Sequence, residues 1–97
     1  MFYARLIYHN NTRLLNICDS NLLGKTIIKE KHSIKISESY YGEKSIKKAE
    51  AEHLLKKCDN INMVGKDIIS LSVSLGIGSE KGVKKIGGIP FLIVFKM

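Results

Sequence analysis

The chain contains 97 residues, of which 44% are hydrophobic and 26% charged, and its formal net charge at neutral pH is +7. This composition excludes a largely disordered chain and predicts a single domain over residues 1–97. The positive charge favours an anionic partner such as nucleic acid or the ribosome. Most of the cations are lysines, whose codons are A/T-rich, so a solvated basic surface without a partner is the alternative.

Two β-prone segments, 2–9 and 13–18, begin the chain and are separated by a short segment, 10–12, that contains two asparagines. Asparagine tolerates positive φ angles, so this arrangement predicts a β-hairpin. Asp19 is then expected to cap a single helical turn over residues 20–23.

The segments 25–30 and 33–37 predict a second pair of strands. From Ser45 the pattern changes to a helical period and predicts a helix over about 45–59, with Ser45 as its N-cap. The apolar stripe of this helix has the spacing i, i+3, i+4, i+7 and consists of Ala51, Leu54, Leu55 and Cys58.

The segment 61–77 fits two interpretations. Between Ile69 and Ile77, apolar residues alternate with serines, which is typical of a strand. Other apolar residues in the segment, such as Ile61, Val64 and Ile68, fit a helical stripe. Local propensity favours the strand, and both interpretations stay open at this stage.

The most distinctive segment is the C-terminal one, in which a basic loop bracketed by glycines leads through a Gly-Gly-x-Pro turn into an apolar run. The run is too short to span a bilayer and predicts a C-terminal strand buried in the core. Flexible backbone beside cations can contact phosphate, so this loop is a candidate RNA-binding site. The alternative is a tight turn that only leads the chain into the last strand. The candidate residues are Lys81, Lys84, Lys85, Gly87 and Gly88.

A second candidate site begins at Tyr40 and Tyr41. These aromatic residues are followed by three lysines, and aromatic rings beside cations can stack on unpaired bases. The alternative is that the tyrosines close the edge of the core, with their hydroxyls in water. The lysines are Lys44, Lys47 and Lys48.

The sequence contains no recognisable catalytic or metal-binding set. His9, His32 and His53 share no ligand spacing with one another or with Cys18 and Cys58, so no metal or other cofactor is expected. The cysteines are expected as small core residues rather than as a disulfide. Without a nucleophile motif or paired carboxylates, we expect neither an enzyme nor a small-molecule substrate. No signal peptide or membrane span is indicated, and we expect a soluble cytoplasmic protein without a membrane partner.

Several short motifs occur in a fixed order along the chain. Together they resemble the small archaeal family known as domain of unknown function four-two-four, over nearly the whole length. Each motif alone is weak, whereas the ordered set with these spacings is specific. Members of the family often carry a histidine after the proline, where this chain has Phe91. The motifs are Cys18-Asp19, Leu22-Leu23-Gly24-Lys25, Tyr40-Tyr41-Gly42, Ile61-Asn62-Met63-Val64-Gly65 and Ile86-Gly87-Gly88-Ile89-Pro90.

The resemblance implies a small α+β domain with a helix, rather than a strand, after Gly65. Combined with the elements above, it predicts a mostly antiparallel sheet with an N-terminal hairpin, two helices at about 45–59 and 64–76, and a C-terminal strand. It also implies an archaeal, cytoplasmic source. The family has no established activity, but its genes tend to lie near translation genes.

Three hypotheses about function follow. The first is a non-enzymatic accessory protein of the archaeal translation machinery that binds ribosomal RNA, ribosomal proteins or a ribosomal subunit through its lysine-rich surface. The second is a protein–protein adaptor or homodimer that uses an exposed sheet edge or the tyrosine surface. The third is a small enzyme with a site near Asp19, Tyr41 and the Gly87-Gly88 turn, for which the sequence supplies no nucleophile or acid–base pair.

Overall fold

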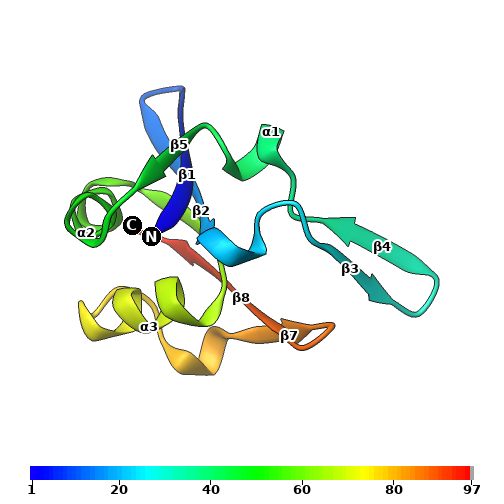
Figure 1. Ribbon diagram of the computed structural model, residues 1–97. Coiled ribbons are helices and arrows are strands. Elements are labelled where there is room, and N and C mark those ends of the chain that lie inside the picture. The colour runs from blue at the N-terminus through cyan, green and yellow to red at the C-terminus, as the bar shows by residue number, and fades with distance from the viewer. Residues whose placement is uncertain (97) are drawn as a thin grey trace.

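Within residues 1–96, the part of the chain described by the computed structural model, a six-stranded sheet forms the centre of the fold (Figure 1). Its strands in chain order are β1 (Phe2–His9), β2 (Thr12–Asp19), β5 (Lys44–Ile46), β6 (Asn60–Val64), β7 (Lys84–Ile86) and β8 (Ile89–Phe95). Their order across the sheet is β5-β1-β2-β6-β8-β7. Every neighbouring pair is antiparallel except β2 and β6, which run parallel. The predicted α+β fold with a mostly antiparallel sheet is therefore confirmed.

The N-terminal hairpin forms as predicted. Asn10 and Asn11 connect β1 to β2 with φ angles of 50° and 61°, the left-handed conformation that two-residue hairpin turns require. Alternation along β1 places Phe2 and Ala4 in the core, as the pattern of the sequence indicates.

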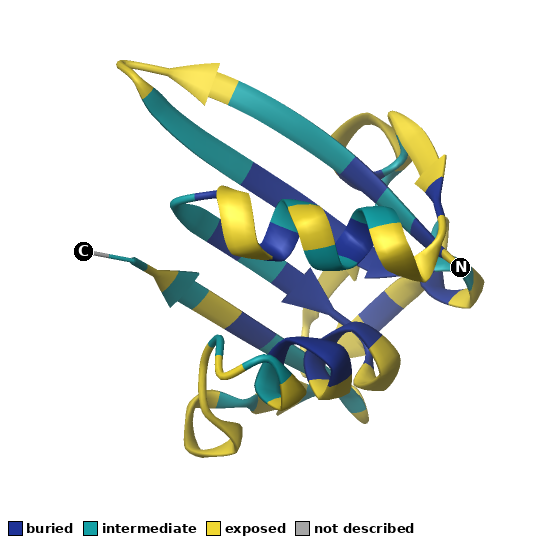
Figure 2. Cartoon of the chain, turned by 90° about the vertical axis from the view of Figure 1, so that its left-hand side faces the viewer, coloured by how far each residue is buried: buried dark blue, intermediate teal, exposed yellow. Residues whose placement is uncertain are grey.

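Two helices, α2 (Lys48–Lys57) and α3 (Lys66–Ser74), cover one face of the sheet. Their buried residues, including Leu55 and Ile68, pack on the inward-facing residues of the central strands, and Figure 2 shows these buried bands beneath the helices. The predicted helix of about 45–59 is confirmed at its centre, but Ser45 is not its cap. Ser45 lies in β5 and pairs with Tyr3, because the burial of the next residue, Ile46, holds this segment against β1.

The ambiguous segment 61–77 contains a strand and a helix, but the strand does not lie where the alternation over residues 69–77 predicted it. Residues 69–74 belong to a helix, so the strand interpretation is wrong there. Strand β6 ends at Val64, and α3 begins at Lys66, so the helix after Gly65 is confirmed within the predicted range of 64–76. Gly65 has a φ of 117°, which is unfavourable for other residues, and it marks the change from strand to helix.

The segments 25–30 and 33–37 also form strands, as predicted, but these stand apart from the main sheet. Strands β3 (Thr26–Lys29) and β4 (His32–Lys35) pair only with each other. We call this hairpin the arm, and Figure 1 shows it projecting from the body of the molecule. Ile27 anchors its base, where the side chain lies beside Gly87.

The face of the sheet opposite α2 and α3 is covered at one end only. There a second, smaller core joins Cys18 and Val64 to residues of the arm and of two short elements: the 3-10 turn η1 (Ser20–Leu22) and helix α1 (Glu38–Tyr41). The other end of this face lies uncovered, and we call it the open face. No helix in the described part of the chain is long and apolar enough to cross a membrane.

The C-terminal segment differs from its prediction in two ways. Residues 84–86 of the predicted loop form strand β7 at the edge of the sheet, preceded by a second 3-10 turn, η2 (Glu80–Gly82). Strand β8 is not buried throughout: Leu92 faces the core, but Ile93 and Phe95 are 58% and 70% exposed. Strand β8 has one face covered by helices and one open face, so its side chains alternate between buried and exposed. Its unbroken apolar sequence gives no sign of this alternation.

Candidate functional site

The strand register determines which side chains share the open face. Residues that pair across strands point to the same side, so Arg5, Asn16, Asn62 and Ile93 form one row across β1, β2, β6 and β8. In the next row, towards the uncovered end, lies Phe95. Polar and exposed apolar side chains therefore lie next to one another on this face.

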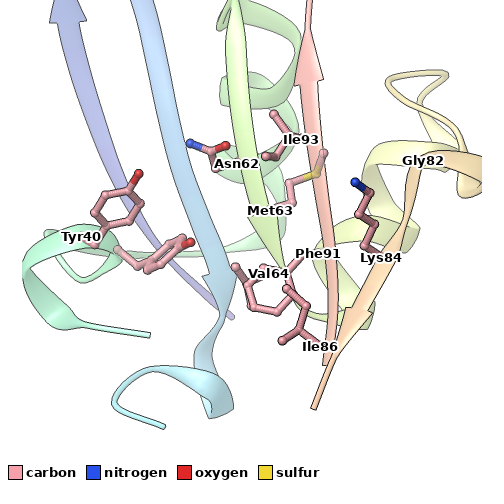
Figure 3. Close-up of a pocket in the computed structure, with 10 residues that line it drawn as sticks. Tyr40, Asn62, Met63, Val64, Gly82, Lys84, Ile86, Phe91 and Ile93 are labelled. Carbon is pink, nitrogen blue, oxygen red and sulfur yellow. The ribbon is translucent and has the colours of Figure 1, made fainter. Parts of the chain in front are cut away.

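A pocket of about 460 Å³ occupies the border between the open face and the smaller core. Small-molecule and nucleotide sites in proteins fall in this size range. Figure 3 shows Asn62 and Ile93 on the strands between Tyr40 on one side and Lys84 on the other. The lining residues are Tyr40, Tyr41, Asn62, Met63, Val64, Gly82, Lys84, Ile86, Phe91 and Ile93.

The two tyrosines of α1 form one wall of the pocket. Their ring centroids are 5.0 Å apart and the ring planes meet at 61°, an edge-to-face arrangement. Tyr40 is 49% exposed, whereas Tyr41 is only 9% exposed and packs in the smaller core. Tyr41 therefore closes the edge of the core, as the second interpretation has it, whereas Tyr40 presents its ring to solvent.

The hydroxyl of Tyr41 is the more informative group of the pair. It makes no hydrogen bond to another group among residues 1–96, yet it is not cut off from solvent. Burial, with smaller contributions from Tyr40 and Cys18, raises the pKa of Tyr41 to about 12. The phenol therefore stays protonated near neutral pH and remains able to donate a hydrogen bond into the pocket.

A chain of amide hydrogen bonds orients Asn62 at the floor of the pocket. The Nδ2 of Asn16 donates to the backbone carbonyl of Tyr40 at 3.3 Å, which turns Asn16 Oδ1 towards Asn62. Asn62 Nδ2 donates to that oxygen at 2.8 Å. Within the described residues, Asn62 Oδ1 accepts no hydrogen bond, so the pocket contains an oriented acceptor.

The structure separates the predicted lysines of the C-terminal segment. Lys84 pairs with Phe91 across β7 and β8, points to the same side of the sheet as the open face and lines the pocket. Lys85 pairs with Pro90, so its side chain leaves the strand on the opposite face. Lys81 lies in η2 and is exposed outside the pocket.

The second group of predicted lysines lies away from the tyrosines that precede it. Lys44 forms an ion pair with Glu50 at 2.9 Å, on the side of the sheet that α2 covers. Lys47 and Lys48 are exposed at the start of α2. Tyr40, Tyr41 and Lys84 are thus the predicted site residues that the fold brings together.

Comparison with protein families gives one match that covers nearly the whole chain. The model of the family "Protein of unknown function (DUF424)" matches residues 7–97. This chain belongs to the DUF424 family. The predicted resemblance is therefore confirmed, and the fold of this DUF424 member has a counterpart in a solved structure. That structure is titled "Crystal structure of an uncharacterized conserved protein from Methanopyrus kandleri". The likeness has a TM-score of 0.77 at 24% identity and covers 99% of this chain and 93% of that one. No curated protein matches.

In the DUF424 chain, Asp19 has a structural role that differs from its prediction. Its carboxylate makes no cap bond to η1. Instead Oδ2 accepts a hydrogen bond from the amide of Asp67 at 2.9 Å, and Oδ1 accepts one from the amide of Ile68 at 2.8 Å. Both amides belong to the first turn of α3, where backbone N–H groups have no partner within the helix. The Asp19 carboxylate therefore caps α3 rather than η1. Burial raises the pKa of Asp19, and these two hydrogen bonds oppose the rise.

Gly87 and Gly88 form the two-residue turn between β7 and β8, with φ angles of 58° and 80°. The segment therefore forms the tight turn that was the alternative interpretation. Glycine at position 87 also has a packing reason. A Cβ atom at Gly87 would lie 2.3 Å from Ile27 at the base of the arm. The turn therefore fits the arm against the sheet.

Metal and thiol chemistry find no support in the described residues. No group of three histidine, cysteine or acidic side chains is placed to hold a metal ion there. Cys18 and Cys58 are free and buried, as expected for small core residues. Burial raises the pKa of the Cys18 thiol to about 12, so it is not a reactive thiolate.

Sequence reasoning missed two parts of the candidate surface. The first is Asn62, whose neighbour Asn16 comes from a distant segment and is revealed only by the parallel pairing of β2 and β6. The second is the arm, whose lysines lie in and between the two predicted strands. They are Lys25, Lys29, Lys31 and Lys35, all of which are exposed.

Proposed function

We propose that this protein is a non-enzymatic accessory protein of the translation machinery that binds ribosomal RNA through the open face. The observation that supports this best is the pocket itself. It combines an exposed aromatic ring, Tyr40, apolar side chains such as Ile93, and a cation, Lys84, on one surface. Aromatic and apolar groups that stack on bases, flanked by cations that contact phosphates, are the usual means of binding single-stranded RNA.

The charge of the arm adds to this proposal. Residues 25–35 include four lysines against one glutamate, Glu30. The salt bridges in the described part of the chain join Arg5 to Glu43 and Lys44 to Glu50, so none involves the arm. A projecting ribbon with unpaired lysines suits contacts with the phosphate backbone, which supply affinity without sequence preference.

The family membership and the structural neighbour from Methanopyrus kandleri support an archaeal setting for the proposal. A cytoplasmic location follows from the proposed ribosomal partner. The link to translation rests on the association expected of the family and on the positive charge, both of which fit a ribosomal subunit as the docking site.

A protein–protein adaptor or homodimer is the second candidate, and a specific observation favours it. Ile93 and Phe95 are exposed side by side along β8, and exposed apolar groups of this kind occur at protein interfaces. Salt distinguishes the two functions, because binding to RNA phosphates weakens steeply as salt rises, whereas an apolar interface does not.

The experiment that tests the proposal measures affinity for archaeal ribosomal RNA at increasing salt, using Lys84→Gln and its matched control Lys85→Gln. Both substitutions remove one charge from the same strand, but only Lys84 points into the pocket. We expect Lys84→Gln to weaken binding and to reduce the slope of log affinity against log salt by about 0.7, the value for one single-strand phosphate contact. Lys85→Gln should change either quantity much less.

Two results would overturn the proposal. If the protein binds no RNA at low salt but sediments as a dimer, or pairs with a protein partner at all salt concentrations, the adaptor function is correct. If RNA binds but the two variants behave alike, the open face is not the binding surface.

A further inference from the structure

The pocket contains two polar groups whose positions the fold fixes and whose hydrogen bonding the described residues leave incomplete. Asn62 Oδ1 is an acceptor, oriented by the amide chain through Asn16 to the carbonyl of Tyr40. The Tyr41 hydroxyl, in a side chain that is nine-tenths buried, both donates and accepts. Neither polar atom is cut off from solvent, so a ligand that completes these bonds takes the place of water.

The remaining lining of the pocket limits what that ligand can be. Val64, Phe91 and Ile93 provide apolar contact, and the ring of Tyr40 provides an aromatic wall. An occupant must therefore be flat and largely apolar on its faces, with an N–H on its edge for the Asn62 oxygen. Lys84 at the rim favours an anionic group next to the flat one.

We propose that the pocket holds a single unpaired nucleobase of the bound RNA and recognises its Watson–Crick edge. An N–H on that edge donates to Asn62 Oδ1, the Tyr41 hydroxyl bonds to a neighbouring edge atom, and Lys84 meets the adjoining phosphate. In a base pair the same edge is occupied by the complementary base, so the pocket selects a bulged or looped nucleotide over a duplex. This inference rests on the proposed RNA binding and specifies which part of the RNA is bound.

The test compares RNA hairpins that differ at one position: a perfect duplex, a bulged adenosine, and a bulged purine ribonucleoside that lacks the amino group. Fluorescence anisotropy at fixed low salt gives the affinity of the full-length protein for each. We expect the adenosine bulge to bind about 10-fold more tightly than the duplex, in line with stacking of one base on an aromatic wall. Loss of the amino group should weaken binding about 3-fold, as for one hydrogen bond.

Protein variants assign these effects to atoms. In Asn62→Ala, adenosine and purine bulges should bind equally, because the acceptor for the amino group is gone. Tyr41→Phe removes only a hydroxyl that has no partner among residues 1–96, so the fold should persist while affinity for the adenosine bulge falls about 3-fold. Tyr8→Phe is the matched control, since Tyr8 is exposed and lies outside the pocket.

Each outcome separates this inference from the proposed function. If the duplex and both bulges bind equally and binding still weakens with salt, the protein binds RNA but the pocket does not hold a base. Unchanged affinity of Tyr41→Phe, together with a persisting amino-group effect in Asn62→Ala, would also refute the pocket assignment. If no RNA binds even at low salt, the proposed function and the inference both fail.

Discussion

Asp19 offers the sharpest test of how the motifs of this family maintain the fold. Asp19 is 4% exposed, and its carboxylate accepts two hydrogen bonds, at 2.9 and 2.8 Å, from the first turn of α3. It belongs to β2, so it ties the helix directly to the central sheet. Replacing Asp19 with alanine should therefore loosen the joint between α3 and the sheet without removing any contact of the open face.

The magnitude follows from the same geometry. A hydrogen bond to a charged group contributes about 1.5 kcal/mol at the lower end, so two such bonds give about 3 kcal/mol. The raised pKa of Asp19 shows that burial disfavours the ionised form, so part of this gain is offset. We expect Asp19→Ala to reduce the free energy of unfolding by about 2 kcal/mol, near the upper value for loss of a helix cap.

Urea unfolding followed by circular dichroism measures this difference, and Asp67→Ala is the control. Asp67 lies in the first turn of α3 but is exposed, so its removal should cost only about 0.5 kcal/mol through the helix dipole. If the two variants lose the same stability, the Asp19 carboxylate acts only as a general charge near the helix and not as a cap.

Two further predictions concern residues next to these groups. Gly65→Ala should destabilise the fold by at least about 3 kcal/mol in the same urea assay, because φ is 117° and a Cβ would lie 2.3 Å from Cγ of Asp19. A loss below that of Asp19→Ala would show that the close approach relaxes easily. For Tyr41, whose pKa rises from 10.0 to about 12, the unfolded phenol loses its proton first, so stability should fall as the pH rises between these values. Absorbance titration should detect one such late tyrosine, and Tyr41→Phe should remove it; its persistence in that variant would contradict the assignment.

Local patterns predicted most of the elements, and the errors arose where long-range contacts decide. The N-terminal hairpin was predictable because its asparagines favour the turn that connects the strands. Ser45 resembled a helix cap, but the burial of Ile46 against β1 extended the chain there. Asp19 was correctly identified as a cap but for the wrong helix, because its real partner lies 48 residues further along the chain.

The candidate site shows the same limit more strongly. Tyr40, Tyr41 and Lys84 could be chosen from sequence because aromatic and basic residues have evident chemistry. That they share a pocket depends on β8 lying between β6 and β7, a topology that no local pattern contains. The lysines that follow the tyrosines were assigned to the same site because they are near in sequence, yet β5 carries them to the far edge of the sheet.

The asparagine pair at the centre of the sheet links stability to the proposed function. Asn16 is almost fully buried and uses its amide to connect Tyr40 and Asn62. Two apolar residues of similar shape would remove both amides, but they would also leave the Tyr40 carbonyl without the donor that Asn16 supplies. The bond from Asn16 to Tyr40 serves the fold, whereas the acceptor of Asn62 bonds to no group among residues 1–96 and stays accessible to solvent or to a ligand. The Asn62 acceptor is therefore the part of the pair that packing does not explain and that the proposed base recognition would use.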